Sequence, residues 1–232
     1  RITSAQPEIV ENERGLLIDF QIIATEVAGK NMTPSLTAEF GAITNGQIAI
    51  GRWLLTSTLQ GLFTDYKASF EHLDSLGNTK LSLIEEVTIH EMIRLVRAPG
   101  ALDDGKFDFL VNAVPDAEDL PDTIFLSNGT TNDVDVVQQA NVDAPPSAQN
   151  LAVQLTAPMP PGWVYLRVPD PGAGQFILKR VVRSDGREIL FNTNAWTTDR
   201  TFIGFGRRPV NENVFHLLDH DSTGLYALHY EL

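Results

Sequence analysis

Apolar and polar residues alternate with a period of two along much of the chain. Between residues 16 and 22, every even position is apolar, whereas Asp19 and Gln21 are polar. Successive side chains of a β-strand point to opposite faces, so this pattern predicts strands with one buried face. The same alternation returns at residues 35–40, 66–71 and 225–232.

Turn-forming pairs separate these apolar segments. Asn and Asp followed by Gly suit turns that need a positive φ, and such pairs occur throughout the sequence. The segment 181–190, with Asp185-Gly186 at its centre, predicts a β-hairpin. Similar pairs are Asn45-Gly46, Asp104-Gly105 and Asn128-Gly129.

Two segments leave a choice between helix and strand. Residues 81–96 have apolar positions at loose helical spacing, but Val87, Ile89, Ile93 and Leu95 also share one face of a strand. We favour the strand, because the alternation covers more of these positions. Residues 134–140 are compatible with either a short helix or a strand.

A segment rich in Pro, Gly and Asp divides the strand-rich sequence in two. It spans residues 97–105, and it separates parts that are each long enough for a β-sandwich. We therefore expect an all-β protein of two β-sandwich domains. The expected domains are residues 1–98 and 107–232, joined by a linker at 99–106.

Composition and charge exclude several classes of protein. The chain has 17 basic and 30 acidic residues, a net charge of −13, which argues against binding nucleic acid. It has no cysteine, so disulfides and thiolate metal sites are excluded. It also lacks an apolar run near the roughly 20 residues that cross a bilayer. We expect an extracellular or cell-surface protein without membrane insertion.

The first half resembles a known class of module. A strand at 35–40 is followed by the turn Asn45-Gly46-Gln47 and by a strand that carries Trp53. This order resembles the immunoglobulin-like modules of bacterial surface proteins, CARDB-type adhesion modules among them, over residues 8–98. The resemblance implies an immunoglobulin-like first domain. It also implies adhesion, spacing or presentation at a cell surface, usually without catalysis.

An acidic cluster at the expected linker suggests a metal site. Asp103, Asp104 and Asp108 lie around Gly105, and calcium takes several oxygen ligands from flexible loops. Calcium is the only cofactor that the sequence suggests, and nothing in it requires one. Because Asp also favours turns for its own hydrogen bonds, ordinary turn residues are the alternative. Further candidates are Asp219 with Asp221, and Asp116, Glu118, Asp119 and Asp122.

The segment 192–213 is the strongest candidate for ligand binding. It has little alternation, and it gathers aromatic residues and positive charge in an acidic chain. Long ordered loops are often functional, and exposed aromatic rings stack on sugars or anchor interfaces. The alternative is that the aromatic rings close the end of a sandwich. The candidate ligand-binding residues are Trp196, Arg200, Phe202, Phe205, Arg207 and Arg208.

Catalytic motifs are incomplete. His90-Glu91-Met92-Ile93-Arg94 has Arg where a zinc-protease helix needs its second His. No Gly-x-Ser-x-Gly elbow occurs. Paired carboxylates for glycoside hydrolysis have no local signature. We therefore expect a protein that is not an enzyme, with a glycoside-acting enzyme as the less favoured alternative.

The polar segment at residues 1–14 suggests how copies could join. It could be an ordinary first strand, or it could pair with the exposed sheet edge of a neighbouring copy. We expect a structural or adhesive module, with other copies or neighbouring surface domains as partners, and strand addition between copies would make it the subunit of a fibre. The alternative is a carbohydrate-binding accessory module that uses the 192–213 segment.

Overall fold

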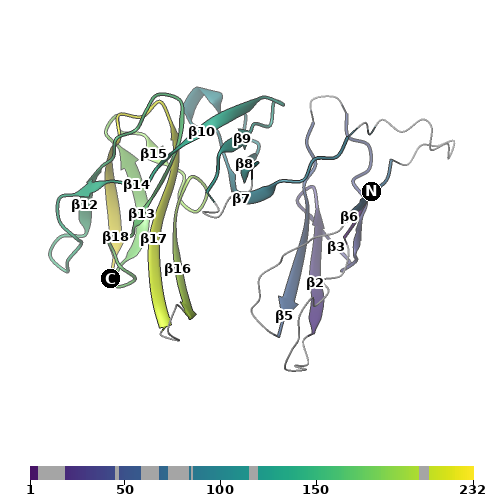
Figure 1. Cartoon of the computed structure of the whole chain (residues 1–232), viewed down its shortest axis with the longest axis horizontal. Helices are drawn as coiled ribbons and strands as arrows, with labels where there is room; N and C mark the ends of the chain where they lie inside the picture. Colours follow the sequence, from purple (N-terminus) through teal and green to yellow (C-terminus); the bar gives the residue numbers. More distant parts are fainter. Residues whose placement is uncertain are drawn as a thin grey trace. The chain divides into compact units, whose positions relative to one another are not determined.

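The computed structural model describes residues 1–4, 19–44, 47–58, 68–72, 84, 86–114, 120–203 and 209–232 (Figure 1). In these residues the regular structure consists of strands and one 3₁₀ helix, η2 (Gly100–Leu102). The all-β, sandwich-like fold that the sequence predicts is confirmed. Contacts divide the chain into two units, Arg1–Thr88 and Ile89–Leu232.

The first unit has two three-stranded sheets with the orders β4-β1-β6 and β3-β2-β5. Thr25 and Val27 of the central strand of the second sheet are buried. Ser35 joins the strands, because its carbonyl accepts bonds from Thr25 Oγ1 and Trp53 Nε1, each at 3.0 Å. The strands are β1 (Ile2–Ser4), β2 (Phe20–Val27), β3 (Lys30–Met32), β4 (Thr37–Ala38), β5 (Gly51–Ser57) and β6 (Ala68–Phe70).

The second unit is a sandwich of a curled seven-stranded sheet and a five-stranded sheet. The larger sheet has the order β16-β17-β13-β10-β9-β8-β7, and the smaller has β11-β12-β18-β14-β15. The larger contains β7 (Glu91–Val96), β8 (Asp108–Asn112), β9 (Thr123–Phe125), β10 (Thr131–Val137), β13 (Trp163–Pro169), β16 (Ala195–Ile203) and β17 (Pro209–His220). The smaller contains β11 (Asn141–Val142), β12 (Ala152–Thr156), β14 (Ile177–Arg183), β15 (Glu188–Ile189) and β18 (Leu225–Glu231).

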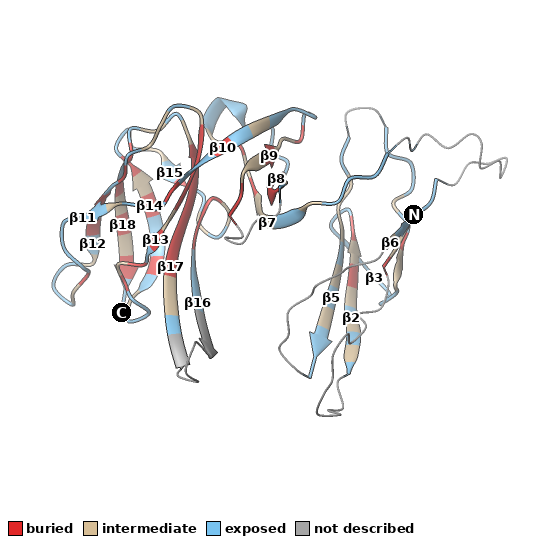
Figure 2. Ribbon diagram, viewed as in Figure 1, coloured by how far each residue is buried: buried red, intermediate tan, exposed pale blue. Residues whose placement is uncertain are grey.

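The main core lies between these two sheets. Three alternate residues of β18, Tyr226, Leu228 and Tyr230, point into this core, as the period of two at 225–232 predicts. Their side chains are almost fully buried (Figure 2). Strands β13 and β17 of the larger sheet meet them with their own alternate residues. The core residues from these three strands are Tyr226, Leu228, Tyr230, Val164, Leu166, Val168, Phe215 and Leu217.

A second core lies on the other face of the seven-stranded sheet. Trp163 and Tyr165 of β13 point into it, so both faces of this strand are buried. Val96 of β7 and Leu110 of β8 belong to the same cluster, as does Trp196 of β16. Residues of β7 and β16, the two edge strands of the sheet, therefore belong to one apolar cluster. Its burial removes apolar area from water and so stabilises the curled sheet.

Side chains, rather than a strand ladder, join the two edge strands of this sheet. The buried amide of Asn194 accepts a hydrogen bond from Arg97 N at 3.0 Å and donates one to Arg97 O at 2.7 Å. Arg94 Nη2 donates to Asn192 O at 2.7 Å. The Asn194 amide thus satisfies the backbone groups of Arg97 that a neighbouring strand would otherwise bind.

The division between the units differs from the expected one. It falls between Thr88 and Ile89, before the 99–106 linker that the sequence predicts. The reason is that β7 pairs with β8 in antiparallel register, so residues 91–96 belong to the second unit. Of the 81–96 segment, for which a strand is favoured, residues 91–96 form β7, whereas residues 86–90 carry no strand. Residues 134–137 lie in strand β10.

Gly224 is required by close backbone packing. Its φ is +78°, and a Cβ at this position would lie 1.9 Å from the carbonyl oxygen of Ala157. Ala157 N also donates to Gly224 O at 2.9 Å. Gly162 is a matched control, because its φ is +94° but a Cβ there meets nothing within 4 Å.

Gly224→Ala is therefore expected to destabilise the protein more than Gly162→Ala. The control substitution bears only the left-handed strain of about 1–2 kcal/mol. Gly224→Ala adds displacement of the Ala157 carbonyl and disturbs the hydrogen bond from Ala157 N to the carbonyl of residue 224. Urea unfolding of both variants measures the difference, and equal losses would contradict the packing described here.

Candidate functional site

The three aspartates predicted to bind calcium serve other partners. Asp103 accepts bonds from Arg97 Nη2 and Gly105 N, each at 2.8 Å. These bonds hold the pKa of Asp103 below its usual value, the Gly105 amide contributing most. Asp104 accepts a bond from the Ser127 hydroxyl at 2.6 Å, and this bond is the largest cause of its lowered pKa.

Asp108 is buried and stabilises the backbone. One of its carboxylate oxygens accepts a bond from Ala98 N and the other from Ser127 N, each at 2.7 Å. Burial raises the pKa of this carboxyl group, against the effect of the two amides. Asp104 and Asp108 therefore fasten the 97–108 segment to Ser127, whereas Asp103 binds groups within that segment.

The described members of the other acidic candidates also have separate partners. Asp221 accepts a bond from Gly162 N at 2.8 Å, whereas Asp219 faces Arg183. Asp122 binds the backbone amides of Ala113 and Val114. Asp116, Glu118 and Asp119 lie outside the described residues. In the part of the chain that the structure describes, no three His, Asp or Glu side chains form a group that could hold a metal ion.

The 192–213 segment is a hairpin rather than a long loop. Strand β16 pairs with β17 from Ala195↔Leu217 to Ile203↔Pro209, which corrects the loop expected from the sequence. Trp196 is only 4 % exposed and belongs to the second core, so it is not an exposed binding residue. The backbone of β16 places Arg200 opposite Glu212 and Phe202 opposite Val210. Phe205, Arg207 and Arg208 lie outside the described residues.

A buried histidine joins β13, β16 and β17. His216 Nδ1 lies 2.7 Å from the Tyr165 hydroxyl, and Nε2 lies 2.7 Å from the Thr198 hydroxyl. The imidazole stacks on Trp196 with ring centroids 4.9 Å apart and planes 3° apart. Arg94 lies over the same indole, 4.7 Å from its centroid. Burial raises the pKa of Tyr165 to about 12, so its phenol stays protonated at neutral pH.

This cluster was missed by sequence reasoning. His216 lies inside the apolar run 214–218, and no motif marks it. Its partners come from strands that are distant in the sequence, so only the sheet order brings them together. One signal was available: every residue from Trp163 to Leu166 is apolar, which is typical of a strand buried on both faces.

A groove of about 720 Å³ lies at the end of β13, beside Pro169, and along residues 211–214 of the neighbouring strand β17. Arg167 and Glu212 line it and form an ion pair at 3.5 Å. Gln138 follows β10 and forms part of the same wall. A smaller cavity of about 250 Å³ in the first unit has mainly apolar walls, which include Phe20, Leu36 and Leu55.

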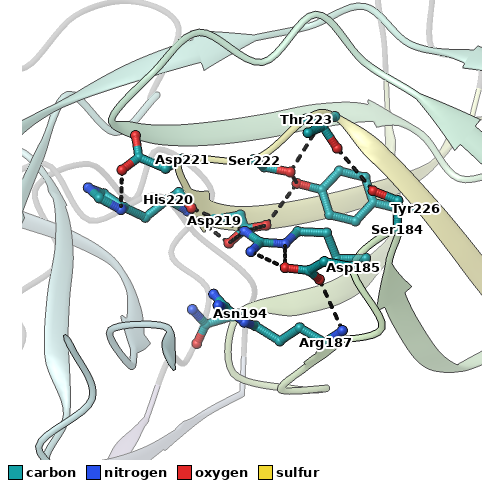
Figure 3. A network of polar contacts seen from close by, with 12 residues as sticks. Ser184, Asp185, Arg187, Asn194, Asp219, His220, Asp221, Ser222, Thr223 and Tyr226 are labelled. Carbon is teal, nitrogen blue, oxygen red and sulfur yellow. Dashed lines mark hydrogen bonds and ion pairs between the residues drawn. The ribbon is translucent and has the colours of Figure 1, made fainter. Parts of the chain in front are cut away.

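A polar network fastens β14 to the turn between β17 and β18 (Figure 3). Asp219 is fully buried, and both of its carboxylate oxygens lie 3.4 Å from Arg183 Nη1. Arg183 also donates to Asp185, which lowers the pKa of Asp185 and raises that of Arg183. The Tyr226 hydroxyl lies 3.0 Å from Asp219 Oδ2 and 2.6 Å from Ser222 Oγ.

This network is suited to stability rather than to nucleophilic catalysis. Ser222 Oγ contacts the Tyr226 phenol and accepts a bond from Gly224 N, so its described partners hold the turn. Burial raises the pKa of Tyr226, which keeps its phenol protonated and unable to act as a base. The His220 imidazole pairs with Asp221, whose Oδ2 lies 3.3 Å from His220 Nδ1.

Comparisons with protein-family models, curated proteins and solved structures found no match. Within the described residues, no helix is long and apolar enough to cross a membrane.

Proposed function

We propose that the chain is a non-catalytic structural or adhesive module of the cell exterior whose copies join by strand addition. The observation that supports this proposal best is the place of β1 in the first unit. Strand β1 is the central strand of its sheet, between β4 and β6. The acidic, cysteine-free composition is compatible with a surface protein of this kind.

Strand β1 holds its two neighbours together. Ile2 is paired with Ala38 of β4 and with Phe70 of β6. Thr3 Oγ1 lies 3.0 Å from Thr37 Oγ1, and Ser4 N donates to Leu36 O at 2.9 Å. Among the described strands, β4 and β6 are each paired only with β1. Without β1, both would present unpaired backbone groups, which are a template for another chain.

The chain between β1 and β2 is long enough for exchange. The strands end and begin at Ser4 and Phe20, and fifteen extended residues reach at most about 50 Å. The β1 of one copy can therefore fill the same place in another with identical pairing. Exchange of an identical element is a low-cost route to assemblies, and strand addition gains its affinity from main-chain hydrogen bonds.

Two single-cysteine variants test this proposal directly. Thr3→Cys and Thr37→Cys, one carrying a size tag, are mixed, unfolded, refolded together and oxidised. Strand exchange brings position 3 of one copy beside position 37 of another, so with equal amounts of the two variants the mixed disulfide should clearly exceed the two self-linked products added together on a non-reducing gel. Random pairing would make the mixed product equal to that sum. Because the natural chain has no cysteine, no other disulfide competes. A mixed product no more abundant than the sum of the self-linked ones would overturn the proposal.

Light scattering gives an independent test. The mass of the full chain should grow with concentration, whereas a chain that starts at Gly15 should stay monomeric and bind a peptide of residues 1–14. The same peptide with Thr3→Pro is the control, because proline removes a ladder donor. A full chain of constant monomeric mass, together with no peptide binding, would contradict strand addition.

A further inference from the structure

The turn between β9 and β10 carries an asparagine in the motif for N-linked glycosylation. Asn128, Gly129 and Thr130 follow one another there, and all three are exposed. The motif is Asn-x-Ser or Asn-x-Thr, with any residue except proline in the middle, and it marks surface loops of secreted proteins. Because so short a motif also occurs by chance, the geometry of the turn has to show whether it suits an acceptor.

The base of this turn is fixed, whereas its tip faces solvent. Ser127 is buried, and it donates its amide hydrogen to Asp108 and its hydroxyl hydrogen to Asp104. Gly129 N donates to Leu126 O at 2.9 Å and so closes the turn. A Cβ at Gly129, whose φ is +88°, would meet nothing within 4 Å. The tip therefore has a held backbone and open space around it.

The threonine of the motif contacts the asparagine amide. Thr130 Oγ1 donates to Asn128 Oδ1 at 2.7 Å, and Thr130 N donates to the same oxygen at 2.9 Å. Both bonds use the amide oxygen, so neither engages Nδ2, the nitrogen that receives the sugar in N-linked glycosylation. The turn thus brings together the amide and the hydroxyl that the motif requires, with the amide at the surface.

Another motif of this kind, Asn31-Met32-Thr33, lies in a different backbone. Asn31 is exposed, but it belongs to strand β3 and pairs with Glu26 of β2. Pro34 follows the motif and restricts Thr33 to extended backbone. A paired strand followed by an extended residue does not fold the threonine back onto the asparagine. Asn31 is therefore a matched control with the same motif and without the turn.

We propose that Asn128 is an N-glycosylation site, to which a transferase attaches a sugar chain through Nδ2. The bond formed joins Nδ2 to the anomeric carbon of the first sugar. The bond broken joins that carbon to the phosphate oxygen of a lipid pyrophosphate donor. The proton that Nδ2 loses neutralises one charge of the released lipid pyrophosphate.

This inference rests on the exterior location in the proposed function, because the motif is used in secreted chains. It does not rest on strand exchange, since the turn and its supporting residues belong to the second unit. A chain that exchanges strands but carries no glycan would therefore refute this inference alone.

Peptide mass mapping of the chain purified from the cells that make it tests the proposal. The Asn128 peptide should carry the added mass of a sugar chain. Peptide N-glycosidase in heavy-oxygen water should release that mass and convert Asn128 to aspartate with uptake of heavy oxygen, which water without the enzyme should not do. An Asn128 peptide of unmodified mass overturns the proposal. So does a peptide whose only change is aspartate formed before treatment, since Asn-Gly also loses ammonia spontaneously.

Variants made in the same cells identify the groups involved. Asn128→Gln removes the acceptor and Thr130→Ala removes the hydroxyl, so both should lose the glycan, whereas Thr130→Ser should retain it. Asn31→Gln is the matched control and should leave the glycan on Asn128 unchanged. All three side chains are exposed, so these substitutions leave the core undisturbed. A glycan that persists in Asn128→Gln and disappears in Asn31→Gln would overturn the assignment to the turn.

Discussion

Replacing Arg183 by leucine should lower the free energy of unfolding by about 3–5 kcal/mol, because it leaves a buried charge without its partner. The Asp219 carboxylate is fully buried, and the Arg183 side chain beside it is only 9 % exposed. After the substitution, the described donors to this carboxylate are the Tyr226 hydroxyl and the His220 amide. Neither supplies a positive charge.

Arg180→Leu is the control for this prediction. Arg180 lies in the same strand, β14, and pairs with Glu188, but their side chains are 51 % and 61 % exposed. Solvent screening makes such a pair worth about 0–1 kcal/mol, so its loss should have little effect. Urea unfolding followed by tryptophan fluorescence measures both variants.

Asp219→Asn in the Arg183→Leu background separates charge from packing. If the uncompensated carboxylate causes the loss, removing its charge should restore part of the lost stability. Equal stability of Arg183→Leu and Arg180→Leu would show that the buried ion pair does not stabilise the fold.

Trp196→Ala should lower the free energy of unfolding by about 3–5 kcal/mol, because it opens a cavity in the second core. The indole is 4 % exposed, stacks on His216 and lies beneath the guanidinium of Arg94. Trp196→Phe retains an aromatic ring and should cost less than the alanine substitution. Thermal and urea unfolding of the two variants give the comparison.

This prediction also separates two roles for Trp196. The sequence presented it as a residue exposed to a ligand, in which case Trp196→Ala would leave stability almost unchanged. A loss within about 0.5 kcal/mol, the range usual for surface substitutions, would contradict its place in the core. A loss of the expected size would agree with its place in the second core.

The sequence by itself determined the secondary structure of much of the second unit. The alternation at 225–232 corresponds to β18, and the Asp185-Gly186 turn joins β14 to β15. These features are local, because the period of two depends on the strand's own geometry and the tight turn on the backbone angles of its own residues, with φ of +86° at Gly186. The all-β class follows from the same patterns.

Only the tertiary structure decided where those strands lie and what their side chains do. Trp196 was placed in a loop by its sequence neighbours, yet pairing with β17 and curling of the sheet bury it. The sequence around Asp108 suggests a metal ligand, yet two backbone amides from separate segments bind its carboxylate. The sequence around a residue predicts its strand and its face, but burial and partners depend on residues distant in the chain, which only the folded sheets bring together.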